Sequence, residues 1–339
     1  MTAERRAPML PFKLIYSEAY YLPIGEHVFP SEKYRRVRDR LISAGIADAN
    51  DFLEPQPASD QEILLVHTPE YVQKLTSGTL SPREEMEMEI PYSRDLVEAF
   101  WLAAGGSILA ARQSLSDRIS ISIGGGFHHA FPDHGEGFCM IQDVAVAIRR
   151  MQREEKIRTA MTLDCDVHQG NGTAVIFAGN RPVSVPQPSV AGLRQHHTRP
   201  GRMRGGSTGD VFTISLHQHN NYPLWKPPSS IDVDLPDGLG DGDYLAWLDS
   251  ALSSGLRQFK PDLLCYVAGA DPYREDQLGG LGLTVEGLKR RDEMVFRVAH
   301  ARNIPVMVTF AGGYAVNVED TVTIHCNTVI AAKEVFGAS

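Results

Sequence analysis

The sequence has few cysteines, no long apolar run and no excess of basic residues, and each of these absences excludes a class of protein. Its 339 residues include only four scattered cysteines, so we expect reduced, buried thiols and not a disulfide framework. No apolar run reaches the roughly 18 residues of a membrane span, and the first residues lack the apolar core of a signal peptide. A net charge of −9 argues against a chain-wide nucleic-acid surface. We therefore expect a cytoplasmic protein without membrane or direct nucleic-acid partners.

The hydrophobic content, 42%, is enough for one large domain with a proper core. Apolar runs predict buried strands at 12–16, 63–66, 119–123, 159–163, 211–216, 263–268 and 306–310. Helical patterns lie at 32–41, 95–112, 144–153, 243–258 and 284–301. Buried strands separated by helices predict right-handed βαβ units and a parallel sheet. We expect a single α/β domain over 1–339, with a mainly parallel sheet of about eight strands flanked by helices.

Three polar side chains follow the predicted strand at 159–163. Asp164, Asp166 and His168 are spaced two residues apart, so in extended chain they project to the same side. Two carboxylates and an imidazole are costly to bury together unless a cation or proton compensates them. A solvated turn would explain this triplet equally well if it stood alone.

Two other segments favour the metal-site interpretation. His128 and His129 follow an apolar strand and a glycine hinge, and Asp271 follows the apolar run that ends near Ala268. In an open parallel sheet the carboxyl ends of the strands meet at one edge, where ligand sites form. We expect the histidine pair and Asp271 to converge there on Asp166 and His168.

Five motifs along the chain carry a family resemblance. They are Gly125-Gly126-Phe127-His128-His129-Ala130, Gly137-Phe138-Cys139, Asp164-x-Asp166-x-His168-x-Gly170-x-Gly172, Gly269-Ala270-Asp271-Pro272 and Gly312-Gly313-Tyr314. In this order they resemble the histone deacetylase and acetylpolyamine amidohydrolase family, which has an arginase/deacetylase-like fold with its site at the strand carboxyl ends. The chain looks most like the class IV branch and its bacterial relatives, and the similarity extends over nearly its whole length.

The resemblance implies a catalytic metal site. Asp166, His168 and Asp271 would hold Zn²⁺ with positions left open for water and substrate, although Fe²⁺ tolerates the same ligands. Such an ion polarises an amide carbonyl and acidifies the attacking water.

The resemblance also assigns roles to the histidine pair. His129 would take the proton of the water and deliver it to the leaving amine, as general base and then acid. His128 would lie closer to Asp164, which favours its charged form. Some family members carry aspartate where this chain has Asn171. A neutral amide can orient His129 but cannot raise its pKa as a carboxylate would.

Further residues are assigned in the same way. Tyr314 would donate a hydrogen bond to the oxygen on which negative charge develops. Phe138 and Leu278 would line a narrow substrate tunnel, although both could equally be core residues, and Tyr314 by itself could be a packed aromatic.

A second, structural cation is implied beside the strand end. K⁺ would be bound by Asp164, by the backbone of Asp166 and His168, and by Ser215 and Leu216 from the next strand.

The function implied is that of a zinc-dependent amidohydrolase that removes an acetyl or longer acyl group from an amine. Its substrate would be acyl-lysine or a small acylated amine such as an acylated polyamine. Two alternatives belong to other classes: a catalytically weak acyl-lysine binding module, and an arginase-like ureohydrolase. The ureohydrolase needs two metals and more ligands than the sequence offers. Acyl length, native metal and oligomeric state are not readable from the sequence.

One stretch, 180–210, breaks the alternation of strands and helices. Between Gly179 and Asp210 it contains five arginines, four prolines and no acidic residue. Such a composition cannot bury enough apolar surface to order its backbone, so we expect a flexible insertion of this α/β domain. A basic lip that recruits acidic partners and an artefact of the reading frame are the alternatives.

Overall fold

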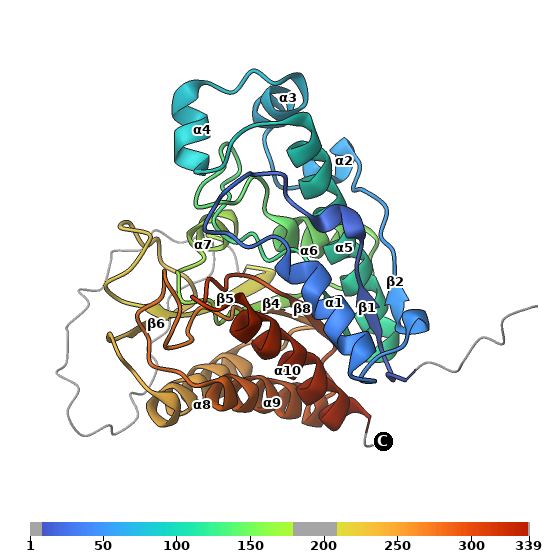
Figure 1. The fold of residues 1–339 in the computed structure, drawn as a ribbon, viewed down its shortest axis with the longest axis vertical. Helices are drawn as coiled ribbons and strands as arrows, with labels where there is room; N and C mark the ends of the chain where they lie inside the picture. The colour runs from blue at the N-terminus through green and yellow to red at the C-terminus, as the bar shows by residue number, and fades with distance from the viewer. Residues whose placement is uncertain (1–8, 179–208, 338–339) are drawn as a thin grey trace, which may run out of the picture.

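The computed structural model describes residues 9–178 and 209–337, and one eight-stranded sheet runs through it (Figure 1). The strands are β1 (Lys13–Ile15), β2 (Phe52–Leu53), β3 (Ile119–Ser122), β4 (Ala160–Asp164), β5 (Val211–Gln218), β6 (Ile231–Leu235), β7 (Leu263–Val267) and β8 (Val306–Thr309). All neighbouring strands are parallel, in the order β2-β1-β3-β8-β7-β4-β5-β6. Because every strand points the same way, all carboxyl ends lie at one edge.

Helices flank this sheet and connect its strands. They are α1 (Lys33–Ser43), α2 (Asp60–Ile63), α3 (Pro69–Ser77), α4 (Pro82–Met88), α5 (Arg94–Asp117), α6 (Asp143–Arg153), α7 (Asn171–Ile176), α8 (Asp241–Gln258), α9 (Val285–Ala301) and α10 (Val318–Phe336). Helix α5 packs against α6 and several strands, whereas α1, α10, α9 and α8 form a second row of neighbouring helices. In Figure 1 the orange and red helices α8, α9 and α10 run side by side below the sheet. Single 3₁₀ turns precede β2 and follow β1, at Ala49–Asp51 and Glu18–Tyr20.

The burial of the strands explains their sequences. Every residue of β3, β4, β7 and β8 is buried, as expected for central strands covered on both faces by helices. The edge strand β6 alternates buried and more exposed positions in Ile-Asp-Val-Asp-Leu. Its apolar residues are buried, whereas Asp232 and Asp234 are more exposed and contact the side chains of Gln169 and His217, respectively.

The predicted fold class is confirmed, and so are six of the seven predicted strands and all five predicted helices. The strand predicted at 63–66 is wrong, because this segment is the end of α2 and the turn after it. Ser59 and Glu62 form a reciprocal capping box that starts a helix just before the apolar run. The strands β2 and β6 and the helices α2, α3, α4, α7 and α10 were not predicted.

The cysteine prediction is confirmed, since all four thiols are free and buried. The predicted insertion at 180–210 lies outside the described residues except for its last two positions. Of these, Asp210 forms an ion pair with Arg149, at 2.6 Å, just before β5 begins.

Candidate active site

Four adjacent strands supply the polar side chains of the site. The central strands β3, β8, β7 and β4 lie next to one another, and each ends in a loop that carries motif residues. The loop after β3 carries His128 and His129, and the loop after β8 carries Tyr314. The loop after β7 carries Asp271, and the loop after β4 carries Asp166 and His168. The order of strands in the sheet therefore gathers residues that are far apart in sequence.

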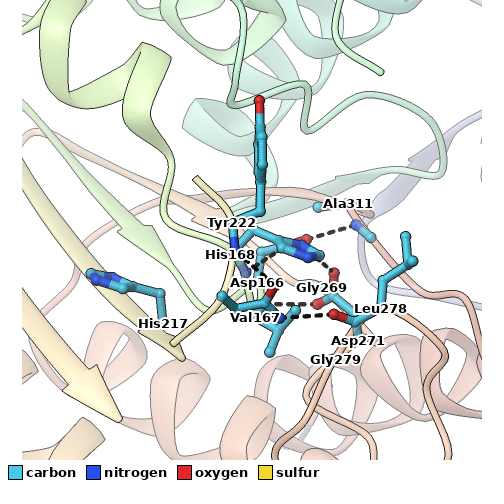
Figure 2. Close-up of polar contacts among 12 residues, drawn as sticks. Asp166, Val167, His168, His217, Tyr222, Gly269, Asp271, Leu278, Gly279 and Ala311 are labelled. Atoms are coloured by element: carbon cyan, nitrogen blue, oxygen red, sulfur yellow. Dashed lines mark hydrogen bonds and ion pairs between the residues drawn. The ribbon is translucent and has the colours of Figure 1, made fainter. Parts of the chain in front are cut away.

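Asp166, His168 and Asp271 form a buried cluster whose candidate ligand atoms all lie within 4.8 Å of one another. Nδ1 of His168 lies 3.1 Å from Oδ1 of Asp166 and 3.4 Å from Oδ2 of Asp271. Figure 2 shows the His168 ring between these carboxylates, with the Tyr222 ring standing above it. Oδ2 of Asp271 is buried and accepts no hydrogen bond from the described residues. A buried carboxylate oxygen without a donor, beside one imidazole and a second carboxylate, fits a divalent cation.

The pKa shifts of the residues in the cluster also favour a bound cation. Burial raises the pKa of Asp271 to about 8, and the charge of Asp166 adds to this. Burial opposes protonation of His168, but its hydrogen bond with Asp166 and the negative charges of Asp166 and Asp271 raise its pKa to about 10. Both shifts reflect two carboxylates in a dry pocket, which favours positive charge between them.

Backbone amides fix the carboxylates of the cluster. Val167 donates its N–H to Oδ1 of Asp271 at 2.9 Å (Figure 2). Gly312 donates its N–H to Oδ2 of Asp166 at 2.8 Å. A Cβ atom at Gly312 would lie 1.9 Å from Oδ2 of Asp271. Only glycine allows this approach of the β8 loop to the cluster.

The two histidines differ in their partners. Nδ1 of His128 lies 2.7 Å from Oδ2 of Asp164, and Nδ1 of His129 lies 2.7 Å from Oδ1 of Asn171. Burial lowers the pKa of His128, but Asp164 and Asp166 outweigh burial and raise it to about 9. Burial and the positive charges of its neighbours hold the pKa of His129 well below its usual range. One imidazole is therefore charged and the other neutral at neutral pH.

Asp143 at the start of α6 holds the loop that carries the histidines. Its carboxylate accepts hydrogen bonds from the backbone of Gly126 at 3.0 Å and Phe127 at 2.8 Å, and from the Ser107 hydroxyl at 2.5 Å. Gly125 and Gly126 both have positive φ, which lets the loop turn sharply after β3. The sequence motif gave the glycines but not their partner Asp143.

Tyr314 lies beside the cluster, in the loop after β8. Its ring centroid is 6.4 Å from that of His168 and 6.1 Å from that of Phe138. Its backbone N–H donates to Oδ2 of Asp276 at 2.6 Å. Burial, with Asp166 and other nearby acids, raises the pKa of the Tyr314 phenol well above its usual value. The hydroxyl therefore stays protonated and can act as a hydrogen-bond donor.

A cavity of about 20 Å³ lies between these groups, enough for about one water molecule. Its lining comprises Phe29, Gly125, Gly126, Phe127, His128, His129, Gly137, Phe138, Cys139, Asp166, Ala311, Gly312 and Tyr314. Phe138 is one of the residues that line this cavity. Leu278 packs against the core and does not line this cavity, although Figure 2 shows it near Asp271.

Of the residues predicted to bind K⁺, Asp164, Ser215 and Leu216 lie on neighbouring strands, and Asp166 and His168 lie in the loop after β4. Asp164 of β4 and Ser215 of β5 are directly paired in the sheet, and Leu216 follows. Oδ1 of Asp164 accepts the backbone N–H of Asp166 at 3.1 Å, while the Ser215 hydroxyl lies 2.9 Å from Nδ1 of His217.

Lys33 is a site residue that the motifs did not indicate. It is fully buried at the start of α1 and donates a hydrogen bond to the Ala311 carbonyl at 2.6 Å. Burial lowers its pKa to about 8, against the attraction of Asp271 and other acids. Its ammonium also lies 4.9 Å from the centre of the Phe29 ring. Lys33 therefore holds the loop between β8 and Tyr314 through the Ala311 carbonyl.

The sequence motifs also did not indicate Glu136 and Tyr222 as residues of the site. The Tyr222 ring centroid lies 4.9 Å from that of His129, and the Tyr222 hydroxyl donates a hydrogen bond to Glu136. Glu136 stands immediately before the motif Gly137-Phe138-Cys139, which was its only sequence signal. Tyr222 follows β5 in a segment without a motif.

Together the fold and site define an α/β protein with a buried cluster able to hold a metal ion beside a histidine pair. The family model described as the histone deacetylase domain matches residues 27–329, and the chain belongs to this family. The family indicates deacetylase or amidohydrolase activity. Among the described residues, none of the helices combines the length and apolar character that crossing a membrane requires.

Several known proteins are similar to this chain. An uncharacterized protein of a Picosynechococcus strain is 36% identical, over 96% of this chain and 99% of the relative. Histone deacetylase 2 of Arabidopsis thaliana is 32% identical, over 91% of this chain and 76% of its own length. The acetoin utilization protein AcuC of Bacillus subtilis is 30% identical, over 84% of this chain and 73% of its own length. These similarities extend over most of each protein.

The fold matches solved structures of the same family. An HDAC homologue complexed with SAHA superposes with a TM-score of 0.74 at 23% identity, over 97% of this chain and 84% of the other. An HDAC homologue from Aquifex aeolicus gives a TM-score of 0.73 at 22% identity, over 96% of this chain and 84% of the other. At these identities the match shows a shared fold.

Proposed function

We propose that this protein is a zinc-dependent amidohydrolase that removes an acetyl or longer acyl group from an amine. The observation that carries the proposal is the buried cluster of Asp166, His168 and Asp271 beside a charged and a neutral histidine. Acyl-lysine and acylated polyamines are the substrates proposed. Fe²⁺ is the alternative metal, because the same ligands accept it.

The metal would be held by Asp166, His168 and Asp271. When bound, a divalent ion there would polarise the amide carbonyl and acidify a water molecule. Two observations support this assignment: Oδ2 of Asp271 is buried and accepts no hydrogen bond from the described residues, and the candidate ligand atoms of the three residues lie close together.

His129 is proposed to move the proton. Its neutral state leaves Nε2 free to accept a proton from the attacking water and to return it to the leaving amine. His128, paired with Asp164, keeps its positive charge beside the developing oxyanion. The low pKa of His129 and the high pKa of His128 support this division of roles.

Tyr314 is proposed to donate a hydrogen bond to the carbonyl oxygen as negative charge develops. Phe138 would guide the acyl chain, since its ring lines the cavity and packs against Tyr314. The paired positions of Asp164 and Ser215 support the further proposal that K⁺ braces this side of the site.

The test combines metal analysis with hydrolysis assays. Purified protein should contain about one equivalent of Zn²⁺ or Fe²⁺, and should hydrolyse a fluorogenic acetyl-lysine or long-acyl-lysine peptide or an acetylated polyamine. SAHA, the compound bound in the fold neighbour, should inhibit it. Saturable acyl-lysine binding without turnover would favour the binding module, and urea release from arginine would favour a ureohydrolase. Either result would overturn the proposal.

A further inference from the structure

Glu136 lies on the opposite side of Asn171 from His129. Nδ2 of Asn171 donates a hydrogen bond to Oε1 of Glu136 at 3.0 Å, while its Oδ1 lies 2.7 Å from Nδ1 of His129. The Tyr222 hydroxyl donates to the same Oε1 atom. The four side chains thus form one chain of hydrogen bonds that ends on the proposed base.

A tight turn holds Glu136 in place. The backbone N–H of Glu136 donates to the Cys139 carbonyl at 3.0 Å, and Cys139 donates back at 2.9 Å. Gly137 and Phe138 between them both have positive φ, of 54° and 65°. A Cβ atom at Gly137 would lie 2.8 Å from Cδ2 of His129, so this turn packs directly on the histidine.

Glu136 is ionised in this setting. Burial opposes its charge, but the nearby imidazole of His134 and the hydrogen bonds from Tyr222 and Asn171 together lower its pKa below the usual value. An ionised carboxylate can only accept hydrogen bonds.

This one-way property decides how the Asn171 amide is oriented. Because Glu136 only accepts, the NH₂ group of Asn171 must face it, and the amide oxygen must then face His129. An amide oxygen also only accepts, so Nδ1 of His129 must carry the hydrogen and Nε2 must be free. If Asn171 turned over, its NH₂ group would face Nδ1 and favour the opposite tautomer, which cannot accept a proton at Nε2. An aspartate at this position would need no such lock, because both of its oxygens accept.

We propose that Glu136 is a positioning residue that locks the Asn171 amide and thereby the tautomer of His129, with Tyr222 holding the carboxylate. This inference rests on the proposed role of His129 as the base. The carboxylate of Glu136 would thus act on His129 indirectly, through the amide of Asn171.

The direct test is ¹⁵N NMR of the zinc-loaded protein labelled at histidine, with His129→Gln used to assign the signals. The wild type should show His129 protonated at Nδ1. Glu136→Ala should show a mixture of tautomers or mainly the Nε2–H form. Glu98→Gln removes an exposed carboxylate of α5 and should leave the spectrum unchanged. An unchanged His129 tautomer in Glu136→Ala would overturn the proposal.

Kinetics supply an independent test through rescue. Glu136→Ala should lower kcat by about 10-fold or more with a smaller change in KM, since a wrong tautomer of the catalytic histidine costs about 10⁴-fold in the serine protease triad. Adding Asn171→Asp to Glu136→Ala should restore at least half of the lost kcat on a logarithmic scale. Asn171→Asp with Glu136 present should be less active than the double variant, because it places two carboxylates together. Absence of rescue would contradict the lock, whereas an inactive wild type with the expected NMR result would count against the proposed function alone.

Discussion

The guanidinium of Arg291 donates a hydrogen bond to the carbonyl of Gly269 at 2.7 Å, two residues before Asp271. The same Nη1 atom lies 3.3 Å from the carbonyl of Cys165, the residue before Asp166. Arg291 is fully buried in α9 and pairs with the equally buried Asp292 at 2.9 Å. One side chain from a helix thus ties together the two loops that carry the carboxylates of the cluster.

Arg291→Met should therefore destabilise the protein and weaken metal binding together. Breaking a buried ion pair leaves an uncompensated charge, here on Asp292, which costs about 3–5 kcal/mol. Urea denaturation should show this loss in the free energy of unfolding, and metal titration a higher Kd. Arg290→Met at the adjacent exposed position is the matched control and should change neither. A stable Arg291→Met protein with unchanged metal affinity would refute the role given to this side chain.

Asp271→Asn should lose bound metal and activity in parallel. The change keeps the shape of the side chain but removes one of the two charges that the cluster presents to a cation. Elemental analysis after dialysis should find well under half of the wild-type metal, and added Zn²⁺ should restore activity only partly. Asp249→Asn on the exposed face of α8 serves as the control for charge removal. Full metal occupancy in Asp271→Asn would show that the ligand assignment is wrong.

His129→Ala should lose more activity than His128→Ala, and both should keep near wild-type metal. General acid–base catalysis contributes about 100- to 10,000-fold, and the proposed mechanism uses His129 in both proton transfers. His128 contributes mainly through its positive charge. Steady-state kcat and metal content of the two variants provide the measurement. A larger loss at position 128 would mean that the two roles are exchanged.

Tyr314→Phe should lower kcat by about 100-fold or more, the cost of losing an oxyanion donor. The ring still packs against Phe138 and Phe29, so thermal unfolding should be nearly unchanged. Steady-state kinetics and a melting curve test both expectations. If kcat stayed within a few-fold of wild type, Tyr314 would be only a wall of the cavity.

His67 should make the protein less stable in mild acid. Its Nε2 atom accepts the backbone N–H of Gln142 at 2.9 Å, and burial lowers its pKa from 6.5 to about 4. The unfolded chain therefore binds more protons than the folded protein between these two values. As pH falls from about 6.5 to about 4, this group should remove up to about 3 kcal/mol of stability.

The measurement is the free energy of unfolding as a function of pH in wild type and His67→Gln. The variant should show a shallower decline in this window, because glutamine can still accept the Gln142 N–H but does not titrate. His300→Gln, at an exposed position of α9, should retain the wild-type slope. Identical slopes in wild type and His67→Gln would exclude His67 as a source of the dependence.

The sequence by itself determined the parallel sheet and the clustering of the motif residues. Asp166 and His168, His129 and Asp271 each follow a buried apolar run, and parallel strands end at one edge of a sheet. The association of these residues needs only local patterns and that rule of topology. The same local logic failed at 63–66, where the capping box formed by Ser59 and Glu62 outweighed the apolar run.

Only the tertiary structure decided which side chains support the site. Lys33 meets Ala311 across 278 positions of sequence, and Arg291 meets Cys165 across 126. Helix α10, rich in β-branched residues that disfavour isolated helices, forms because it packs between α1 and α9. Glu136 reaches Asn171 only because the turn at Gly137 and the position of α7 bring them together. Strand periodicity is a property of neighbouring residues. These contacts instead depend on how elements far apart in sequence pack together, and the spacing of residues along the chain does not encode that packing.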